Sequence, residues 1–320
     1  MKRPVSPLLI GRTSEMSVLT EAFDDATGGR QRTILISAEG GGGKTRLIRE
    51  ASERFRDRAL ILAGWCIEQG EPGLPYAPFV SIVRQVVRER GLANTVALVG
   101  REGARELARL LPELGPASSE GDPGMARSRL FEAVRTLLEA LAVEATVVVA
   151  LEDLHWADRG TRDLLVYLAR NLHHARLLLL ASYRAEAVGE GHALRAGLAE
   201  LTRIEGVTAL VLPRLSNSEV ALQLEAMLGH EPAPDVVTAV YARGGGVPLF
   251  TEAMLAPDGS VRTRLPGSLR DLLLSTANEL PERCREVLRA MAVGGFRVGH
   301  RLLAAVAGGK GLETALRAAV

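Results

Sequence analysis

Lysine is almost absent from this 320-residue chain, which has 39 basic residues. Only Lys2, Lys44 and Lys310 are lysines, and the rest are arginines. Codon bias in a GC-rich genome accounts for that excess, and it makes the single internal lysine before the C-terminal stretch, Lys44, conspicuous. The formal net charge is +1, so no excess of one sign would gather nucleic acid or an anionic membrane surface.

Cysteine is also scarce, with only Cys66 and Cys284 in the chain and no C-x-x-C motif. This usage excludes a disulfide framework and a zinc-ribbon site, and it fits a reducing cytoplasm. The basic segment 1–7 is not followed by a long apolar run, so we expect no signal peptide. The apolar runs 146–151 and 177–181 are too short to cross a bilayer. We therefore expect a cytoplasmic protein without a membrane partner.

Continuous apolar runs alternate with helical patterns over the first two-thirds of the chain, and 47% of all residues are hydrophobic. Runs of this kind predict strands that are covered by helices on both faces, as in a parallel sheet. We expect an α/β fold in which a parallel sheet is sandwiched in three layers. The expected strands are 33–37, 59–63, 146–151, 176–182 and 207–212. The expected helices are 44–55, one that opens at Pro78, 127–142 and 161–171.

After Pro213 the strand patterns nearly stop. Ser216 and Glu219 have the spacing of a capping box at the start of a helix over 220–228, and a second helix over 235–242 ends at a run of glycines. The turn-rich segment 257–266 is typical of a linker. Further helices are expected at 269–279, 281–290, 300–306 and 312–320. The last pattern stops without a C-cap signal, so we expect the protein to continue.

A glycine-rich segment, Ala38-Glu39-Gly40-Gly41-Gly42-Gly43-Lys44-Thr45, lies between the first expected strand and the following helix. Four consecutive glycines allow backbone N–H groups to converge on phosphate oxygens. Lys44 adds a mobile cation, and the Thr45 hydroxyl is a ligand for Mg²⁺. Ala38 departs from the glycine that usually opens this motif. The segment predicts a P-loop NTPase that binds ATP and Mg²⁺.

An acidic pair, Glu152 and Asp153, ends the apolar strand 146–151. Acids at the carboxyl end of a parallel strand face the ligand crevice. Glu152 would hold Mg²⁺, directly or through water, and Asp153 would orient or deprotonate the attacking water. Glutamate is one methylene longer than the usual aspartate, so the sequence leaves open which acid serves the metal. Arg184 ends the next strand, where it would reach the γ-phosphate, or would only cap the strand as a surface residue.

His155 and Trp156 follow the acidic pair. We expect Trp156 to pack against the next helix and His155 to act through its position. A general base and a stacking platform are the alternative.

Several stretches together resemble the nucleotide-binding region of the STAND class of ATPases, and within it the large ATP-binding LuxR-type (MalT-like) transcriptional regulators. The matching stretches are Leu9-Ile10-Gly11-Arg12-x-x-Glu15, Gly43-Lys44-Thr45-Arg46-Leu47, Leu74-Pro75-Tyr76-Ala77-Pro78-Phe79, Leu151-Glu152-Asp153-Leu154-His155-Trp156-Ala157-Asp158, Ser182-Tyr183-Arg184 and Gly246-Val247-Pro248-Leu249-Phe250.

The resemblance implies further roles. Ile10, Gly11 and Arg12 would lie beside the adenine, Arg46 would join the nucleotide site, and Pro248 would close over the nucleotide from a helical domain. Val247 stands where the family usually has asparagine. The implied domains are an ATPase core over 1–212, a small helical domain over 213–260 and a truncated winged-helix-like domain over 261–320. Sensor and effector domains beyond residue 320, and self-association of the ATP form, are implied as well.

The sequence therefore predicts a slow ATPase that acts as the switch module of a signal-responsive transcriptional regulator. The alternatives are an AAA-type ATPase with a DNA-binding winged helix, and an ATPase module attached to a cyclase or kinase. Arg283, Arg285 and Arg289 would be the recognition stripe of a DNA-binding helix, but Glu282 and Glu286 interrupt it. We expect no direct DNA binding by these 320 residues.

Overall fold

The computed structural model describes most of the chain as two compact units, Ser6–Phe250 and a smaller unit made mainly of residues from Thr251 onward. The described residues are 5–67, 75–117, 123–256, 260–262, 267, 270, 274, 277–278, 280–294, 298–308 and 311–319.

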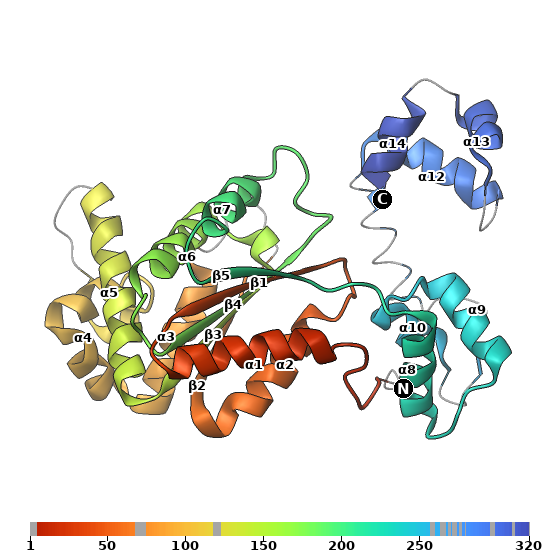
Figure 1. The fold of residues 1–320 in the computed structure, drawn as a ribbon. Helices are drawn as coiled ribbons and strands as arrows, with labels where there is room; N and C mark the ends of the chain where they lie inside the picture. Colours follow the sequence, from red (N-terminus) through yellow and green to blue (C-terminus); the bar gives the residue numbers. More distant parts are fainter. Residues whose placement is uncertain are drawn as a thin grey trace. The chain divides into compact units, whose positions relative to one another are not determined.

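A five-stranded sheet forms the centre of the larger unit, in the order β2-β3-β4-β1-β5 (Figure 1). All four strand pairings are parallel. The strands are β1 Arg32–Ala38, β2 Ala59–Trp65, β3 Thr146–Glu152, β4 Leu177–Arg184 and β5 Val207–Val211. The sheet confirms the predicted α/β fold, and each expected strand is found within two residues of its predicted bounds.

Burial along the strands follows their place in the sheet. Every residue of the inner strand β3 is buried, as its continuous apolar run predicts. The edge strand β5 is different, because none of its residues is buried and Val211 is 67% exposed. The expectation that every strand is covered on both faces is therefore wrong for β5, whose apolar run belongs to a sheet edge.

Helices cover both faces of the sheet, and the sheet separates two cores (Figure 1). On one face α1 and α2 pack through the stacked rings of Phe23 and Phe55, whose centroids are 4.1 Å apart. The other face carries the larger core, to which α3, α5 and α6 contribute. The helices of this layer arrangement are α1 Thr13–Thr27, α2 Lys44–Phe55, α3 Ala77–Arg90, α4 Leu92–Leu107, α5 Pro123–Glu144, α6 Arg159–Asn171 and α7 Ala193–Leu201.

Three of these helices, α1, α4 and α7, have no counterpart among the expected elements. Helix α1 does carry an apolar stripe, since Met16, Leu19 and Phe23 are buried. Helix α4 is interrupted at Gly100, where φ is +72°. A broken periodicity of this kind weakens the helical signal in the sequence.

The chain that follows β5 is helical, as the sequence predicts. Helix α8, Asn217–Leu228, begins with both hydrogen bonds of the Ser216–Glu219 capping box. Helix α9, Pro234–Gly244, ends at Gly245, and α10 spans Pro248–Met254. The division of this region into a core ending at 212 and a helical domain over 213–260 stays a prediction.

The smaller unit contains three described helices, α12 Glu282–Gly294, α13 His300–Ala307 and α14 Leu312–Ala319, around Cys284, Val287 and Leu303. They match the helices expected in this region. Val261 pairs with Leu255 in an isolated antiparallel bridge inside the expected linker. The rest of that linker, apart from 260–262, and most of the expected helix 269–279 lie outside the described residues. The winged-helix assignment stays a prediction.

Among the described residues, no helix is long and apolar enough to cross a membrane. Both cysteines are buried and free.

The close approach of β2 to α3 generates a stability prediction. A Cβ at Gly64 would lie 2.3 Å from the backbone oxygen of Pro78, and a backbone atom cannot move aside like a flexible side chain. We expect Gly64→Ala to lower the free energy of unfolding by about 1–3 kcal/mol in urea titrations. Gly197→Ala is the matched control, because a Cβ there meets nothing within 4 Å. Equal unfolding midpoints for the two variants would contradict this packing argument.

Candidate functional site

The phosphate-binding loop lies between the end of β1 at Ala38 and the start of α2 at Lys44. Gly41 and Gly43 have φ values of +81° and +97°, which favour glycine strongly. A Cβ at Gly41 would also lie 2.7 Å from the Cβ of Leu249. Two loop glycines are therefore required by the backbone, and one of them also by a neighbouring segment.

The departure at Ala38 is matched inside the loop. A Cβ at Gly42 would lie 2.8 Å from the Cβ of Ala38 and 3.1 Å from the backbone oxygen of Glu39. The methyl group of Ala38 therefore takes space that a side chain at position 42 would need. This contact gives a physical reason why a loop that opens with alanine also has glycine at position 42.

Lys44 is the buried cation of the loop, with only 7% of its surface exposed. Its ammonium donates to the backbone oxygens of Ala38 (2.8 Å) and Glu39 (3.0 Å). Burial lowers the pKa of Lys44, while the carboxylates of Glu186 and Asp153 act in the opposite direction. The charge of Arg184 also lowers the pKa of Lys44. The structure thus brings the predicted Lys44, Asp153 and Arg184 into one electrostatic neighbourhood.

Glu152 is buried at the end of β3 with 5% exposure. Burial raises the pKa of Glu152, and its side-chain hydrogen bonds with Thr45 and Trp65 oppose that shift. Its Oε2 atom is buried without a hydrogen-bond partner in the described part of the chain. A hydroxyl next to a carboxylate with a spare oxygen is the hard oxygen set that Mg²⁺ prefers. Thr45 and Glu152, both predicted from the sequence, therefore fit a magnesium ion.

Asp153 adopts the left-handed conformation (φ +59°), which is uncommon for a residue other than glycine. Its backbone N–H donates to Ser182 Oγ at 3.3 Å, and its side chain is 35% exposed. The turn at Asp153 therefore separates two neighbouring acids by environment. Glu152 is enclosed beside Thr45, whereas Asp153 reaches solvent.

His155 links the turn after β3 to the end of β4. Its Nδ1 accepts a hydrogen bond from the backbone N–H of Arg184 (3.4 Å) and lies 3.9 Å from Asp153 Oδ1. Burial, together with the charges of Arg184 and Lys44, lowers the pKa of His155 to about 4. The imidazole is therefore neutral near pH 7 and accepts through Nδ1. Trp156 lies against the His155 ring and is 38% exposed, and its packing against the next helix stays a prediction.

Arg12 connects three segments of the larger unit. Its side chain is 3% exposed and donates to the backbone oxygens of Gly11 (3.0 Å), Gly42 (3.2 Å) and Pro213 (2.7 Å). Glu15 lies 3.7 Å away and partly offsets the lowering of the Arg12 pKa by burial. The Arg12 guanidinium therefore holds the phosphate loop to the chain that leaves the sheet, a contact that the sequence did not predict.

The other residues of the predicted nucleotide site have varied surroundings. A Cβ at Gly11 would lie 2.6 Å from Glu219 Oε1. Ile10 lines a groove of about 800 Å³ between α1 and α2. Arg46 is half-buried in the first turn of α2. The backbone oxygen of Pro248 accepts a hydrogen bond from Gln223 at 3.2 Å, and the N–H of its neighbour Leu249 donates to Gly41 at 3.3 Å.

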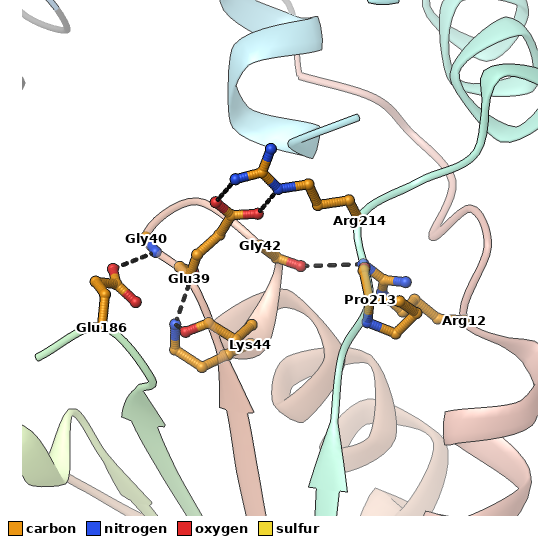
Figure 2. A network of polar contacts seen from close by, with 9 residues as sticks. Arg12, Glu39, Gly40, Gly42, Lys44, Glu186, Pro213 and Arg214 are labelled. Carbon is orange, nitrogen blue, oxygen red and sulfur yellow. Dashed lines mark hydrogen bonds and ion pairs between the residues drawn. The ribbon is translucent and has the colours of Figure 1, made fainter. Parts of the chain in front are cut away.

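Two further side chains hold the phosphate loop, as Figure 2 shows. Arg214 forms a two-pronged ion pair with Glu39, at 2.6 and 2.7 Å. Glu186 accepts a hydrogen bond from the Gly40 N–H at 2.7 Å. Sequence reasoning missed both contacts, because the partners are 175 and 146 residues apart and neither belongs to a recognisable motif.

Comparison with known proteins places this geometry in a family. The pattern of the AAA ATPase domain matches residues 8–180. Uncharacterized protein R02095 of Rhizobium meliloti (strain 1021) is 29% identical over 326 residues, which cover 93% of this chain and 31% of that protein. The chain thus spans less than a third of the length of this curated relative.

Three solved structures are similar at lower identity. The STAND protein PH0952 of Pyrococcus horikoshii, which has a tetratricopeptide repeat sensor, is 14% identical with a TM-score of 0.46, over 99% of this chain and 40% of that chain. Orc1 of Aeropyrum pernix, in complex with DNA, is 17% identical with a TM-score of 0.47, over 94% and 77%. DnaA of Aquifex aeolicus, bound to AMPPCP, is 12% identical with a TM-score of 0.43, over 90% and 71%.

The family match covers more than half of the chain and includes the phosphate loop, the buried lysine and the acidic end of β3. AAA ATPases bind nucleotide, generally with Mg²⁺. The chain belongs to the AAA ATPase domain family and is a P-loop ATPase.

Proposed function

We propose that this chain is the ATP-dependent switch module of a signal-responsive transcriptional regulator of the LuxR type, acting in the cytoplasm. The observation that supports this proposal is that an ion pair and a hydrogen bond join the phosphate loop directly to the segment that follows the sheet. Arg214 pairs with Glu39, and Leu249 donates to Gly41. A change of loop conformation on nucleotide exchange would therefore act directly on the segment that contains Arg214 and Leu249.

In this proposal each site residue has a distinct task. Lys44 and the N–H groups of Gly40 to Gly43 hold the phosphates, and Ile10, Gly11 and Arg12 border the adenine. Arg46 lies at the edge of the nucleotide site, and Pro248 covers it from the helical side. Thr45 and Glu152 would hold Mg²⁺, which neutralises charge on the phosphate oxygens. Asp153 orients the attacking water, and Arg184 contacts the γ-phosphate.

The contacts that would transmit the switch are weak enough to exchange. The Arg214 side chain is 60% exposed, and an exposed ion pair contributes only about 0–1 kcal/mol. Breaking and remaking it on each cycle therefore costs little. The proposal includes self-association of the ATP form, and sensor and effector domains in the remainder of a longer protein. The relative from Rhizobium meliloti is long enough to hold such domains.

Lys44→Ala tests the phosphate-binding assignment. Loss of the buried ammonium should weaken binding of a fluorescent ATP analogue by about 10- to 100-fold, or roughly 1.4–2.8 kcal/mol. Thermal unfolding of the variant should stay close to that of the wild type, since Lys44 lies at the first position of α2 and is not part of the apolar core. Arg49→Ala removes an exposed cation from the same helix and should leave affinity unchanged. Unchanged affinity for Lys44→Ala would contradict the assignment.

Glu152→Gln and Asp153→Asn should have different effects. Glu152→Gln should abolish the gain in ATP affinity that Mg²⁺ provides, because the buried carboxylate beside Thr45 loses its charge. Asp153→Asn should keep Mg²⁺·ATP bound and lower the turnover rate by about 10²- to 10⁴-fold. Binding titrations with and without Mg²⁺, together with phosphate release, separate the two. If both variants lose turnover with equally intact binding, the assigned division of roles is wrong.

The described C-terminal helices should not bind DNA specifically. Arg283 pairs with Glu286 at 3.0 Å, and Arg285 and Arg289 both pair with Glu282. Paired arginines offer little net charge to phosphates. A gel-shift assay at about 150 mM salt, where nonspecific binding fades, should show no sequence-dependent complex with these 320 residues. Sub-micromolar specific binding would favour the alternative of an AAA-type ATPase with a DNA-binding winged helix.

A further inference from the structure

The backbone after β4 holds Glu186 immediately beside the phosphate loop. It follows β4 two residues after Arg184, and the N–H of the intervening Ala185 donates to the backbone oxygen of Ala38 at 3.2 Å. The segment after β4 is therefore tied to the first residue of the loop. This tie brings the Glu186 carboxylate to the Gly40 N–H, where the hydrogen bond is 2.7 Å long (Figure 2).

The Glu186 carboxylate acts on two groups of the phosphate loop. It accepts a hydrogen bond from the Gly40 N–H, and its charge raises the pKa of Lys44 against the effect of burial. A converging backbone N–H and a lysine ammonium are also what a phosphate loop offers to a phosphate group. Glu186 thus occupies the loop with an anionic oxygen of the same hydrogen-bonding type as a phosphate oxygen.

Gly40 has one N–H, and that N–H cannot serve the carboxylate and a phosphate oxygen fully at the same time. A Cβ at Gly40 would lie 3.4 Å from Glu186 Oε1, so the carboxylate also covers the glycine itself. Glu186 is exposed to solvent, which allows its side chain to swing away without disturbing the core. A phosphate oxygen that takes the Gly40 N–H would therefore displace the Glu186 carboxylate reversibly.

Resting on the proposed nucleotide-binding function, we propose that Glu186 is an internal competitor for the terminal phosphate of the nucleotide. We assign the competition to the terminal phosphate because of where Glu186 lies. A phosphate-loop lysine such as Lys44 reaches the β- and γ-phosphates, and Glu186 is in the same segment as Arg184. The apparent association constant for ATP then equals the intrinsic constant multiplied by the fraction of molecules in which Glu186 has left the loop. The competitor also makes that fraction a quantity on which other parts of the protein can act.

Isothermal titration of the 320-residue protein with Mg²⁺ and ATP, ADP or AMP tests this proposal. Glu186→Gln keeps the shape of the side chain but replaces a charge-assisted hydrogen bond with a neutral one of about half the strength. We expect ATP affinity to rise by about 3- to 30-fold. The gain should be smaller for ADP and absent for AMP, which lacks the β- and γ-phosphates that Lys44 reaches. Glu186→Ala should give at least the same gain.

Glu190→Gln is the matched control, since Glu190 is an exposed acid of the same connection between β4 and α7. It removes the same charge and should leave all three affinities unchanged. Inorganic triphosphate provides a second probe, because it should displace a fluorescent ATP analogue more strongly from Glu186→Gln than from the wild type.

Three outcomes overturn the proposal, and they can be told apart. If the wild type binds ATP and Lys44→Ala does not, but Glu186→Gln and Glu186→Ala bind ATP equally or more weakly, Glu186 is not a competitor while the nucleotide site stands. If the wild type binds no ATP at all, the nucleotide-binding function fails and the competitor fails with it. An equal gain in Glu190→Gln would assign the effect to net charge and would also overturn it.

Discussion

The buried guanidinium of Arg12 is the interaction on which the geometry of the site depends. A charged group at 3% exposure is tolerated only when it is hydrogen-bonded and paired. Arg12 donates to three backbone oxygens, and the Glu15 carboxylate lies 3.7 Å away. Those oxygens belong to Gly11, to Gly42 of the loop and to Pro213 after the sheet. The cost of burying one charge is thus offset only when three distant segments come together.

Around this joint the loop is held by side chains of both signs. Arg214 pairs with Glu39, and Glu186 accepts from Gly40. Both contacts are exposed, whereas that of Arg12 is buried. The permanent attachment and the exchangeable ones are therefore made by chemically similar groups that differ in their access to water. Burial, more than residue type, therefore distinguishes the lasting contact of Arg12 from the exchangeable contacts of Arg214 and Glu186.

The sequence was most informative where the physical constraint is local. Continuous apolar runs predicted all five strands. For the inner strands the reason is that buried parallel strands must be apolar along their whole length, whereas the edge strand β5 carries such a run without being buried. The phosphate loop and the acidic end of β3 were predicted because a few consecutive residues provide their chemistry. Helix α4 was missed because Gly100 breaks its period. Arg214, Glu186 and Trp65 were missed because their roles arise from partners far along the chain. In a chain so rich in arginine, Arg214 also had no compositional signal.

The contact between Ala38 and Gly42 has a consequence for natural variation among related chains. The two positions share room for a single methyl group, since a Cβ at position 42 would lie 2.8 Å from that of Ala38. A glycine at position 38 would relieve the tighter of the two contacts that a side chain at position 42 meets. The two positions are therefore expected to covary, so that a side chain at one of them is accompanied by glycine at the other. The glycine at position 42 of the loop is then the counterpart of the alanine at the end of β1.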